Sequence, residues 1–153
     1  MSVRIVLDAA AFNVLDTRDG RKLRAVVHRT LRRGGEICCA AVTLAEVCRG
    51  TQRTRRVESA LAHDRGGQRI RVIHTDERLA KLVGAILHDT HSGSDRLADA
   101  HVVAVCGGAD RATVMTSDPD DIAALADALP GTRVLTRDPA DPFRPGEDNR
   151  SGG

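Results

Sequence analysis

The chain has 153 residues, of which 41% are hydrophobic and 29% charged, and this size allows one domain with a substantial core. It has no apolar stretch near the ~20 residues that span a bilayer, and its start lacks the pattern of a signal peptide, so we expect a cytoplasmic protein with no membrane segment. The net charge of +2 does not by itself indicate a nucleic-acid partner, and the absence of Trp and Tyr argues against a module that stacks bases on aromatic rings.

Hydrophobic periodicity and turn residues predict strands and helices in alternation. The expected strands cover residues 3–7, 36–42, 70–74, 112–117 and 132–136. The helices expected between them cover residues 21–35, 44–50, 54–64, 75–90 and 119–129, with a further helix entered through 92–95. Thr43 is a suitable N-cap for the helix 44–50. This order predicts an α/β sandwich in which helices flank a mostly parallel sheet of about five strands.

No internal repeat and no linker divides residues 1–137, which we therefore predict to be one domain. The remainder, 138–153, is rich in Pro, Gly and charged residues. Such a composition is typical of a disordered tail, so we expect the folded body to end before Asp138.

Carboxylates stand at comparable places on several of the predicted elements. Asp8 directly follows the first strand, and Asp118 follows the fourth. Glu46 falls in the first turn of the helix after the second strand, and Asp99 lies early in the helix that leads to the fourth. Ligands of such sheets sit beyond the carboxyl ends of the strands, so we expect these four side chains to converge at one edge. Unpaired carboxylates in close proximity repel one another, and a hard divalent cation removes the conflict.

This acidic group predicts Mg²⁺- or Mn²⁺-dependent hydrolysis of phosphodiester bonds. A bound cation of this kind lowers the pKa of a water molecule and stabilises negative charge on phosphate oxygens. The sequence contains no phosphate loop, no Gly-x-Ser-x-Gly elbow and no His-Glu-x-x-His motif that would indicate a different site. We therefore expect the catalytic residues to be Asp8, Glu46, Asp99 and Asp118.

Two other aspartates compete for places in this site. Asp95 lies four residues before Asp99 on the same helix face, so either could be the third ligand, and spacing favours Asp99. Asp121 falls in the first turn of the helix after the fourth strand, where the helix dipole favours anions. It could reach the metal through water, although exposure to solvent is the simpler interpretation.

Arginines are concentrated between residues 49 and 71. Arginine makes bidentate contacts with phosphate, so this run is a candidate RNA-binding surface, although a solvated face is the ordinary interpretation of such a run. The candidate RNA-binding residues are Arg49, Arg53, Arg55 and Arg56.

Four segments together resemble a PIN domain, and more narrowly they are similar to the VapC-type toxins of bacterial toxin–antitoxin pairs. They are VLDAAAF (6–12), AAVTLAEVCRG (40–50), LADAHVVAV (97–105) and VMTSDPDDI (114–122). The resemblance extends over about residues 3–136. It implies a PIN-like three-layer sandwich and a metal-dependent endoribonuclease that cuts structured RNA. It also implies an antitoxin protein that covers the site, and a homodimer.

The resemblance also implies roles for individual residues. It assigns the metal ligands to Asp8, Glu46, Asp99 and Asp118. Thr116 resembles the hydroxyl residue that supports the last aspartate. The chain departs from the family where Ala9 and Ala10 replace a common Ser or Thr, and where His101 replaces an apolar residue. We expect His101 to be a packed or surface histidine rather than a ligand.

Other functions remain open at this point. The same fold could serve housekeeping RNA processing, or it could be an inactive domain that binds RNA or protein. A phosphoacceptor receiver domain also gathers carboxylates around magnesium, but it requires an Asp at the end of the third strand and a Lys at the end of the fifth. Here His74 ends the third strand and the fifth ends in Leu-Thr-Arg-Asp, so the receiver hypothesis fits poorly.

Overall fold

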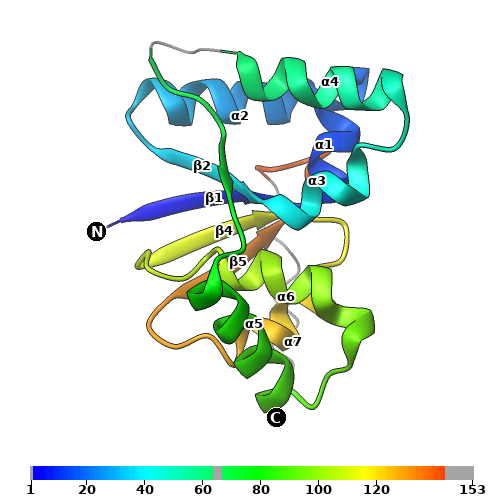
Figure 1. Ribbon diagram of the computed structural model, residues 1–153. Helices are drawn as coiled ribbons and strands as arrows, with labels where there is room; N and C mark the ends of the chain where they lie inside the picture. The colour runs from blue at the N-terminus through cyan, green and yellow to red at the C-terminus, as the bar shows by residue number, and fades with distance from the viewer. Residues whose placement is uncertain (1, 64–66, 144–153) are drawn as a thin grey trace.

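The structure is a computed structural model that describes residues 2–63 and 67–143. Its centre is a parallel sheet of five strands in the order β3-β2-β1-β4-β5, which confirms the predicted α/β class (Figure 1). The strands are β1 (Val3–Leu7), β2 (Glu36–Ala40), β3 (Arg71–Ile73), β4 (Arg111–Met115) and β5 (Arg133–Arg137). All lie within one or two residues of the predicted positions.

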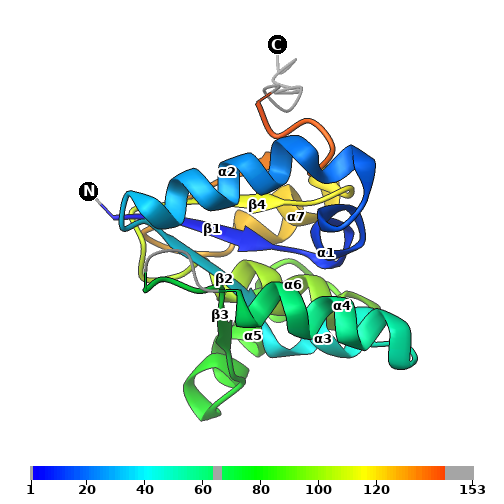
Figure 2. The ribbon, with the colours of Figure 1, turned by 90° about the horizontal axis from the view of Figure 1, so that it is seen from above.

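Helices cover both faces of the sheet and complete a three-layer sandwich (Figures 1 and 2). One face carries α1 (Ala9–Leu15), α2 (Arg21–Arg32), α3 (Ala41–Val47) and α4 (Thr51–Ala62). The other face carries α5 (Glu77–Asp89), α6 (Leu97–Ala104) and α7 (Pro119–Ala126). Short 3₁₀ helices, η1 (Arg18–Gly20) and η2 (Ser94–Arg96), precede α2 and α6. None of the helices in the described ranges is both long and apolar enough to cross a membrane.

The order in which the chain adds strands to the sheet reverses between β1 and β4. From β1 the chain proceeds to β2 and β3 on one side, and it then returns to β4 and β5 on the other. The helical connections therefore leave β1 and β4 toward opposite faces, which opens a crevice at their carboxyl ends. Leu7 pairs with Met115, so the residues that follow these two strands are brought side by side.

The sheet divides the buried side chains into two apolar clusters. Alternate residues of a strand point to opposite faces, so Ile5 and Leu7 pack beneath α1 and α2 while Val6 packs against α6 and α7. Each cluster is completed by helix residues such as Phe12 on one face and Ile122 on the other.

Two local predictions differ from the structure. The helix α1 was not predicted, because seven residues are too few to show helical periodicity; its start is marked by Asp8, whose side chain accepts a hydrogen bond from the Ala9 N–H. The prediction that Thr43 caps a helix was wrong. The helix α3 already begins at Ala41, and Thr43 lies inside it, 1% exposed, with no hydrogen-bond partner for its Oγ1 atom among the described residues.

The predicted tail is ordered over its first six residues. Pro139 and Pro142 are buried, and Asp141 forms an ion pair with Lys22 of α2 at 3.2 Å. The guanidinium of Arg29 lies 5.5 Å from the centre of the Phe143 ring. Residues 138–143 therefore extend the folded body along α2, which corrects the predicted boundary, while 144–153 lie outside the described residues.

Candidate active site

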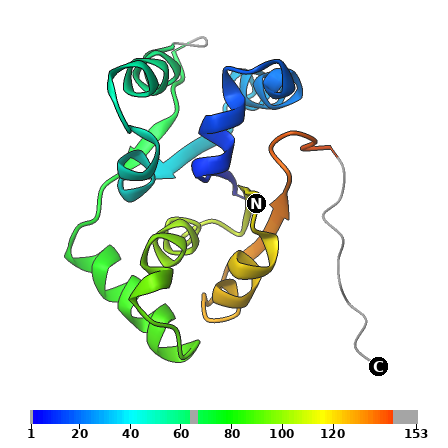
Figure 3. The same ribbon diagram turned by 90° about the vertical axis from the view of Figure 1, so that its right-hand side faces the viewer.

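The four carboxylates predicted as ligands belong to elements that meet at the carboxyl edge of the sheet, which faces the viewer in Figure 3. Asp8 follows β1 and Asp118 follows β4, where they are the N-cap residues of α1 and α7. Asp99 lies in the first turn of α6. Glu46 lies in the last turn of α3 rather than the first, and α3 contacts both α1 and α6. Glu46 is thereby brought toward Asp8 and Asp99.

Asp8 is held in one orientation by hydrogen bonds to both of its oxygens. It is 6% exposed; its Oδ1 accepts from the Ala9 N–H at 2.7 Å, and its Oδ2 accepts from Thr116 Oγ1 at 2.8 Å. Thr116 Oγ1 in turn accepts from the Asp118 N–H at 3.0 Å. The hydroxyl thus connects the ends of β1 and β4. A carboxylate fixed in this way can act as a ligand without losing further side-chain entropy.

Replacing Thr116 with valine is expected to lower the free energy of unfolding by about 1–3 kcal/mol, because it leaves an oxygen of buried Asp8 and the Asp118 N–H without a partner. Thr116→Ser retains the hydroxyl and serves as the control. Urea unfolding of the three proteins measures the difference. A valine variant as stable as the serine variant would show that the hydroxyl bridge has no energetic role.

The pKa of Glu46 is raised above the ordinary value. Glu46 is exposed, but its partial burial is the largest cause of this shift. The charges of Asp8 and then Asp99 raise it further, and Arg49 opposes them. The carboxylate therefore lies in a region of unbalanced negative charge.

Asp99 stands at the centre of the acidic group. Partial burial raises its pKa above the ordinary value, and the charges of Asp8 and Asp121 raise it further. Asp118 adds a smaller contribution in the same direction, whereas Arg96 lowers the pKa. Charges at the ends of β1 and β4, in η2 and in α7 thus act on one side chain.

The raised pKa of Asp99 predicts a dependence of stability on pH. Because the folded state holds this proton more tightly than the unfolded state, ionised Asp99 destabilises the fold above its raised pKa, and the penalty vanishes below the ordinary pKa of about 4. With a chelator at about pH 7, Asp99→Asn should therefore raise the melting temperature by roughly 1–2 °C, equivalent to about half a kcal/mol. The difference should disappear toward pH 4, as followed by circular dichroism. A constant difference at all pH values would contradict the electrostatic origin.

Arg96 is a residue of the site that the sequence analysis did not identify. Its Nη1 atom lies 2.6 Å from Asp121 Oδ2 and 3.9 Å from Asp99 Oδ2, and its Nε atom lies 3.8 Å from Asp95 Oδ2. Asp95, the alternative third ligand, has a side chain that is 79% exposed, compared with 27% for Asp99. The geometry therefore favours Asp99 over Asp95, and it pairs Asp121 with an arginine. The spacing of three residues between Arg96 and Asp99 was the available signal.

The donor atoms of this group suit a hard divalent cation. All are carboxylate oxygens, which Mg²⁺ and Mn²⁺ prefer, and the mutual repulsion described above would be relieved by positive charge. In the ranges 2–63 and 67–143, no three His, Cys, Asp or Glu side chains lie close enough together to hold a metal ion. The donor set therefore fits a cation in its chemistry, while the side chains are spaced more widely than the ligands of a bound ion.

The predicted RNA-binding arginines lie close to this edge, at the end of α3 and on α4. Arg49 donates from Nε to the Ala45 carbonyl at 2.9 Å, and Arg53 donates from Nη2 to Asn13 Oδ1 at 2.7 Å. Arg55 and Arg56 are exposed. The guanidinium groups of α4 therefore lie on a solvent-facing helix that is connected through α3 to the acidic group.

The structure places both departures from the family pattern. Ala9 opens α1, and its N–H donates to Asp8 Oδ1. His101 is 8% exposed, and its Nδ1 atom lies 2.8 Å from the Leu97 carbonyl of the same helix. Of the two placements predicted, packed or on the surface, the structure shows the packed one.

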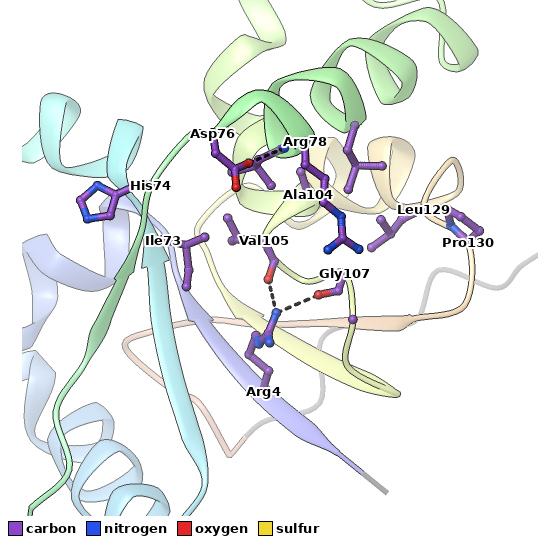
Figure 4. Close-up of a pocket in the computed structure, with 13 residues that line it drawn as sticks. Arg4, Ile73, His74, Asp76, Arg78, Ala104, Val105, Gly107, Leu129 and Pro130 are labelled. Atoms are coloured by element: carbon purple, nitrogen blue, oxygen red, sulfur yellow. Dashed lines mark hydrogen bonds between the residues drawn. The ribbon is translucent and has the colours of Figure 1, made fainter.

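A hollow of about 480 Å³ lies elsewhere, between β1, the start of α5 and the loops that precede β4 and β5 (Figure 4). Arg4 donates from Nη1 to the Val105 and Gly107 carbonyls at 2.7 and 2.8 Å. The one carboxylate among its lining residues, Asp76, accepts from the Leu79 N–H and caps α5. Ile73 and His74 at the end of β3 line its other side, and no carboxylate of the acidic group lines the hollow.

Comparison with known proteins supports the same family as the sequence motifs. A protein-family model described as PIN domain matches residues 5–128, which is most of the chain and includes every carboxylate of the group above. No curated protein matches the chain. PIN domains are generally metal-dependent nucleases. With its five-stranded parallel sheet between two layers of helices, the chain belongs to the PIN domain family.

Proposed function

We propose that this chain is a Mg²⁺- or Mn²⁺-dependent endoribonuclease and that it is the toxin of a VapBC-type toxin–antitoxin pair. The observation that carries the nuclease proposal is the excess of negative charge at the carboxyl edge of the sheet. Partial burial and then the charge of Asp8 raise the pKa of both Glu46 and Asp99, and Arg49 and Arg96 only oppose these shifts, so carboxylates from three separate elements share one region of excess negative charge. Such an arrangement destabilises a fold unless a bound cation neutralises the negative charge.

Within this proposal, Asp8, Glu46, Asp99 and Asp118 hold the cation. When bound, the cation activates a water molecule and stabilises charge on the scissile phosphate. Asp8 is kept in place by Thr116 and the Ala9 N–H, which reduces the reorganisation needed during the reaction. The arginines at the end of α3 and on α4 bind phosphates of the RNA.

The toxin assignment rests on the likeness of the four motif segments to VapC-type proteins. An antitoxin that covers the acidic edge and a homodimer belong to the same proposal. Positive charge from an antitoxin at this edge would relieve the repulsion between Glu46 and Asp99, as a bound metal ion would.

Incubating the purified protein with a structured RNA in Mn²⁺, in Mg²⁺ and in a chelator tests the nuclease proposal. Cleavage should require the cation, should generate discrete internal cuts, and should be absent from a single-stranded DNA of the same sequence. Retained RNA binding without cleavage in any cation would favour the alternative of an inactive PIN-fold binding domain. Sequencing RNA ends after brief induction of the protein in cells tests the toxin assignment, which requires growth arrest together with new RNA ends.

A further inference from the structure

The hollow beside Arg4 has the size and the lining of a small-molecule site. Its volume of about 480 Å³ falls within the range of roughly 300–1,000 Å³ that is typical of ligand pockets. Apolar side chains that are buried or half-buried form its walls, among them Ile73, Leu82 and Leu129. They come from the end of β3, from α5 and from the turn before β5. Such walls can shield the apolar part of a ligand from water.

Gly107 keeps part of this space open. The φ angle of Gly107 is not in the positive region, so the backbone conformation there does not require glycine. A Cβ atom at this position would lie 3.6 Å from Leu129 Cδ1 and 3.7 Å from Leu82 Cδ2, which belong to the apolar walls. A longer side chain at position 107 would therefore occupy space between these two leucines. Glycine leaves that space to a ligand.

Two guanidinium groups from different elements enter the hollow. Arg4 reaches it from β1 and Arg78 from the first turn of α5, and Figure 4 shows both side chains directed toward the space beside Gly107. The ring of His74 points away from them (Figure 4). Within residues 2–63 and 67–143, Arg78 forms no ion pair and no hydrogen bond through its side chain. Its guanidinium is therefore available to a ligand.

The carboxylates around the hollow do not balance this positive charge. Glu36 pairs with Arg4 Nε at 3.0 Å and with Arg71 Nη1 at 2.5 Å, so two arginines share one negative charge. Asp76 is the one carboxylate among the lining residues, and its side chain caps α5. With Arg78 included, three arginines face two carboxylates, which leaves an excess of one positive charge. The hollow therefore favours a ligand that carries negative charge.

We propose that this hollow is a binding site for a small organic anion. The apolar part of the ligand lies against Leu82 and Leu129, and its single carboxylate or phosphate group lies between Arg4 and Arg78. The planar donors of arginine bind both kinds of anion through charge-assisted hydrogen bonds. Bonds from Arg4 Nε and Nη1 to the protein already fix the plane of its guanidinium, so little side-chain entropy is lost on binding. The site is separate from the acidic group and does not depend on the proposed nuclease function.

Amide chemical shifts of the full chain, followed by NMR during titration, test the proposal. The probes are hexanoate and hexyl phosphate, beside 1-hexanol and inorganic phosphate, which each supply half of the ligand. At least one amphipathic anion should give saturable shifts at Leu82, Gly107 and Leu129, with an affinity about tenfold higher than that of either half. The tighter of the two anions identifies the preferred head group.

Three variants separate charge from shape. Arg78→Glu should weaken binding of the anion by about tenfold or more and should leave binding of 1-hexanol unchanged. Lys81→Glu makes the same change of charge at an exposed position of α5 that does not line the hollow, and it should bind the anion as the wild type does. Gly107→Leu should abolish binding of the anion and of 1-hexanol, because the side chain fills the space between the walls.

Shifts that do not saturate would overturn the proposal. So would an affinity for 1-hexanol equal to that for both anions, or equal losses in Arg78→Glu and Lys81→Glu. Thermal unfolding of each variant checks that the fold is retained. A Cβ atom at position 107 would lie 3.1 Å from the Ala104 carbonyl oxygen, so the two α5 variants decide the result if Gly107→Leu does not fold. Because RNA cleavage is not measured, failure of this proposal leaves the nuclease assignment unchanged.

Discussion

Asp8→Asn should abolish cation-dependent RNA cleavage while the protein keeps its fold. Residues that merely support metal ligands typically cost about 10–100-fold when they are replaced, so the loss of a proposed ligand should cost at least about 100-fold. Asparagine has the shape of aspartate and can still accept the Ala9 N–H bond that caps α1. The charge that the cation needs is removed, and the local geometry remains. The effect on activity should therefore far exceed the effect on stability.

Initial rates of RNA cleavage in Mn²⁺, measured beside thermal unfolding in chelator, separate the two effects. Asp127→Asn is the matched control, because Asp127 is exposed at the far end of α7 and precedes β5 at the amino edge of the sheet. This control should cleave at the wild-type rate. Undiminished cleavage by the Asp8 variant would remove Asp8 from the mechanism, and with it the proposed metal site.

Replacement of Arg53, Arg55 and Arg56 together by alanine should weaken RNA binding and reduce its dependence on salt. Each phosphate contact changes the slope of log K against log salt concentration by about 0.7 for single strands and 0.9 for duplexes, so the loss of three contacts should make the slope smaller by roughly 2–3. The affinity should fall most at low salt, where released counterions contribute most. Arg53 also loses its hydrogen bond to Asn13, so a small loss of stability is expected as well.

The matched control carries the same change of charge at the opposite edge. Arg32, Arg33 and Arg69 are exposed and precede β2 and β3, away from the carboxyl ends of the strands. Their replacement by alanine should leave the salt slope close to that of the wild type. Equal effects of the two triple variants would show that RNA responds to overall charge and that α4 is an ordinary solvated helix.

The sequence predicted the sheet well because each strand is a short apolar run that ends at a polar or glycine-containing turn. Periodicity also placed α2 and α5, each of which is long enough for its buried face to repeat. The helix α1 and the ordered segment 138–143 were missed for a common reason. Both are short and depend on tertiary contacts, with Asp8 and Thr116 in the first case and α2 in the second.

The candidate site was predictable where a residue directly follows a strand. Asp8 and Asp118 could be placed because the carboxyl ends of parallel strands share an edge. Glu46 and Asp99 depended on how α3 lies against α6, which the sequence does not encode locally. The spacing of three residues to Asp99 was a sequence signal for Arg96, but its short contact with Asp121 could not be predicted, because Asp121 is on another helix and the contact is set by the direction of one long side chain.

Because the sheet divides the interior into two apolar clusters, the two layers of helices can accumulate substitutions separately during evolution. The helix that bears the arginines packs on one apolar cluster, and the helices that bear Asp99 and Asp121 pack on the other. Substitutions at sites without shared contacts have nearly additive effects on stability, so substitutions beneath α4 need not alter the packing of α6 and α7. Within the proposed function, the arginine surface of α4 can therefore be remodelled without direct effect on Asp99 and Asp121, whereas Glu46 on α3 shares its layer with α4.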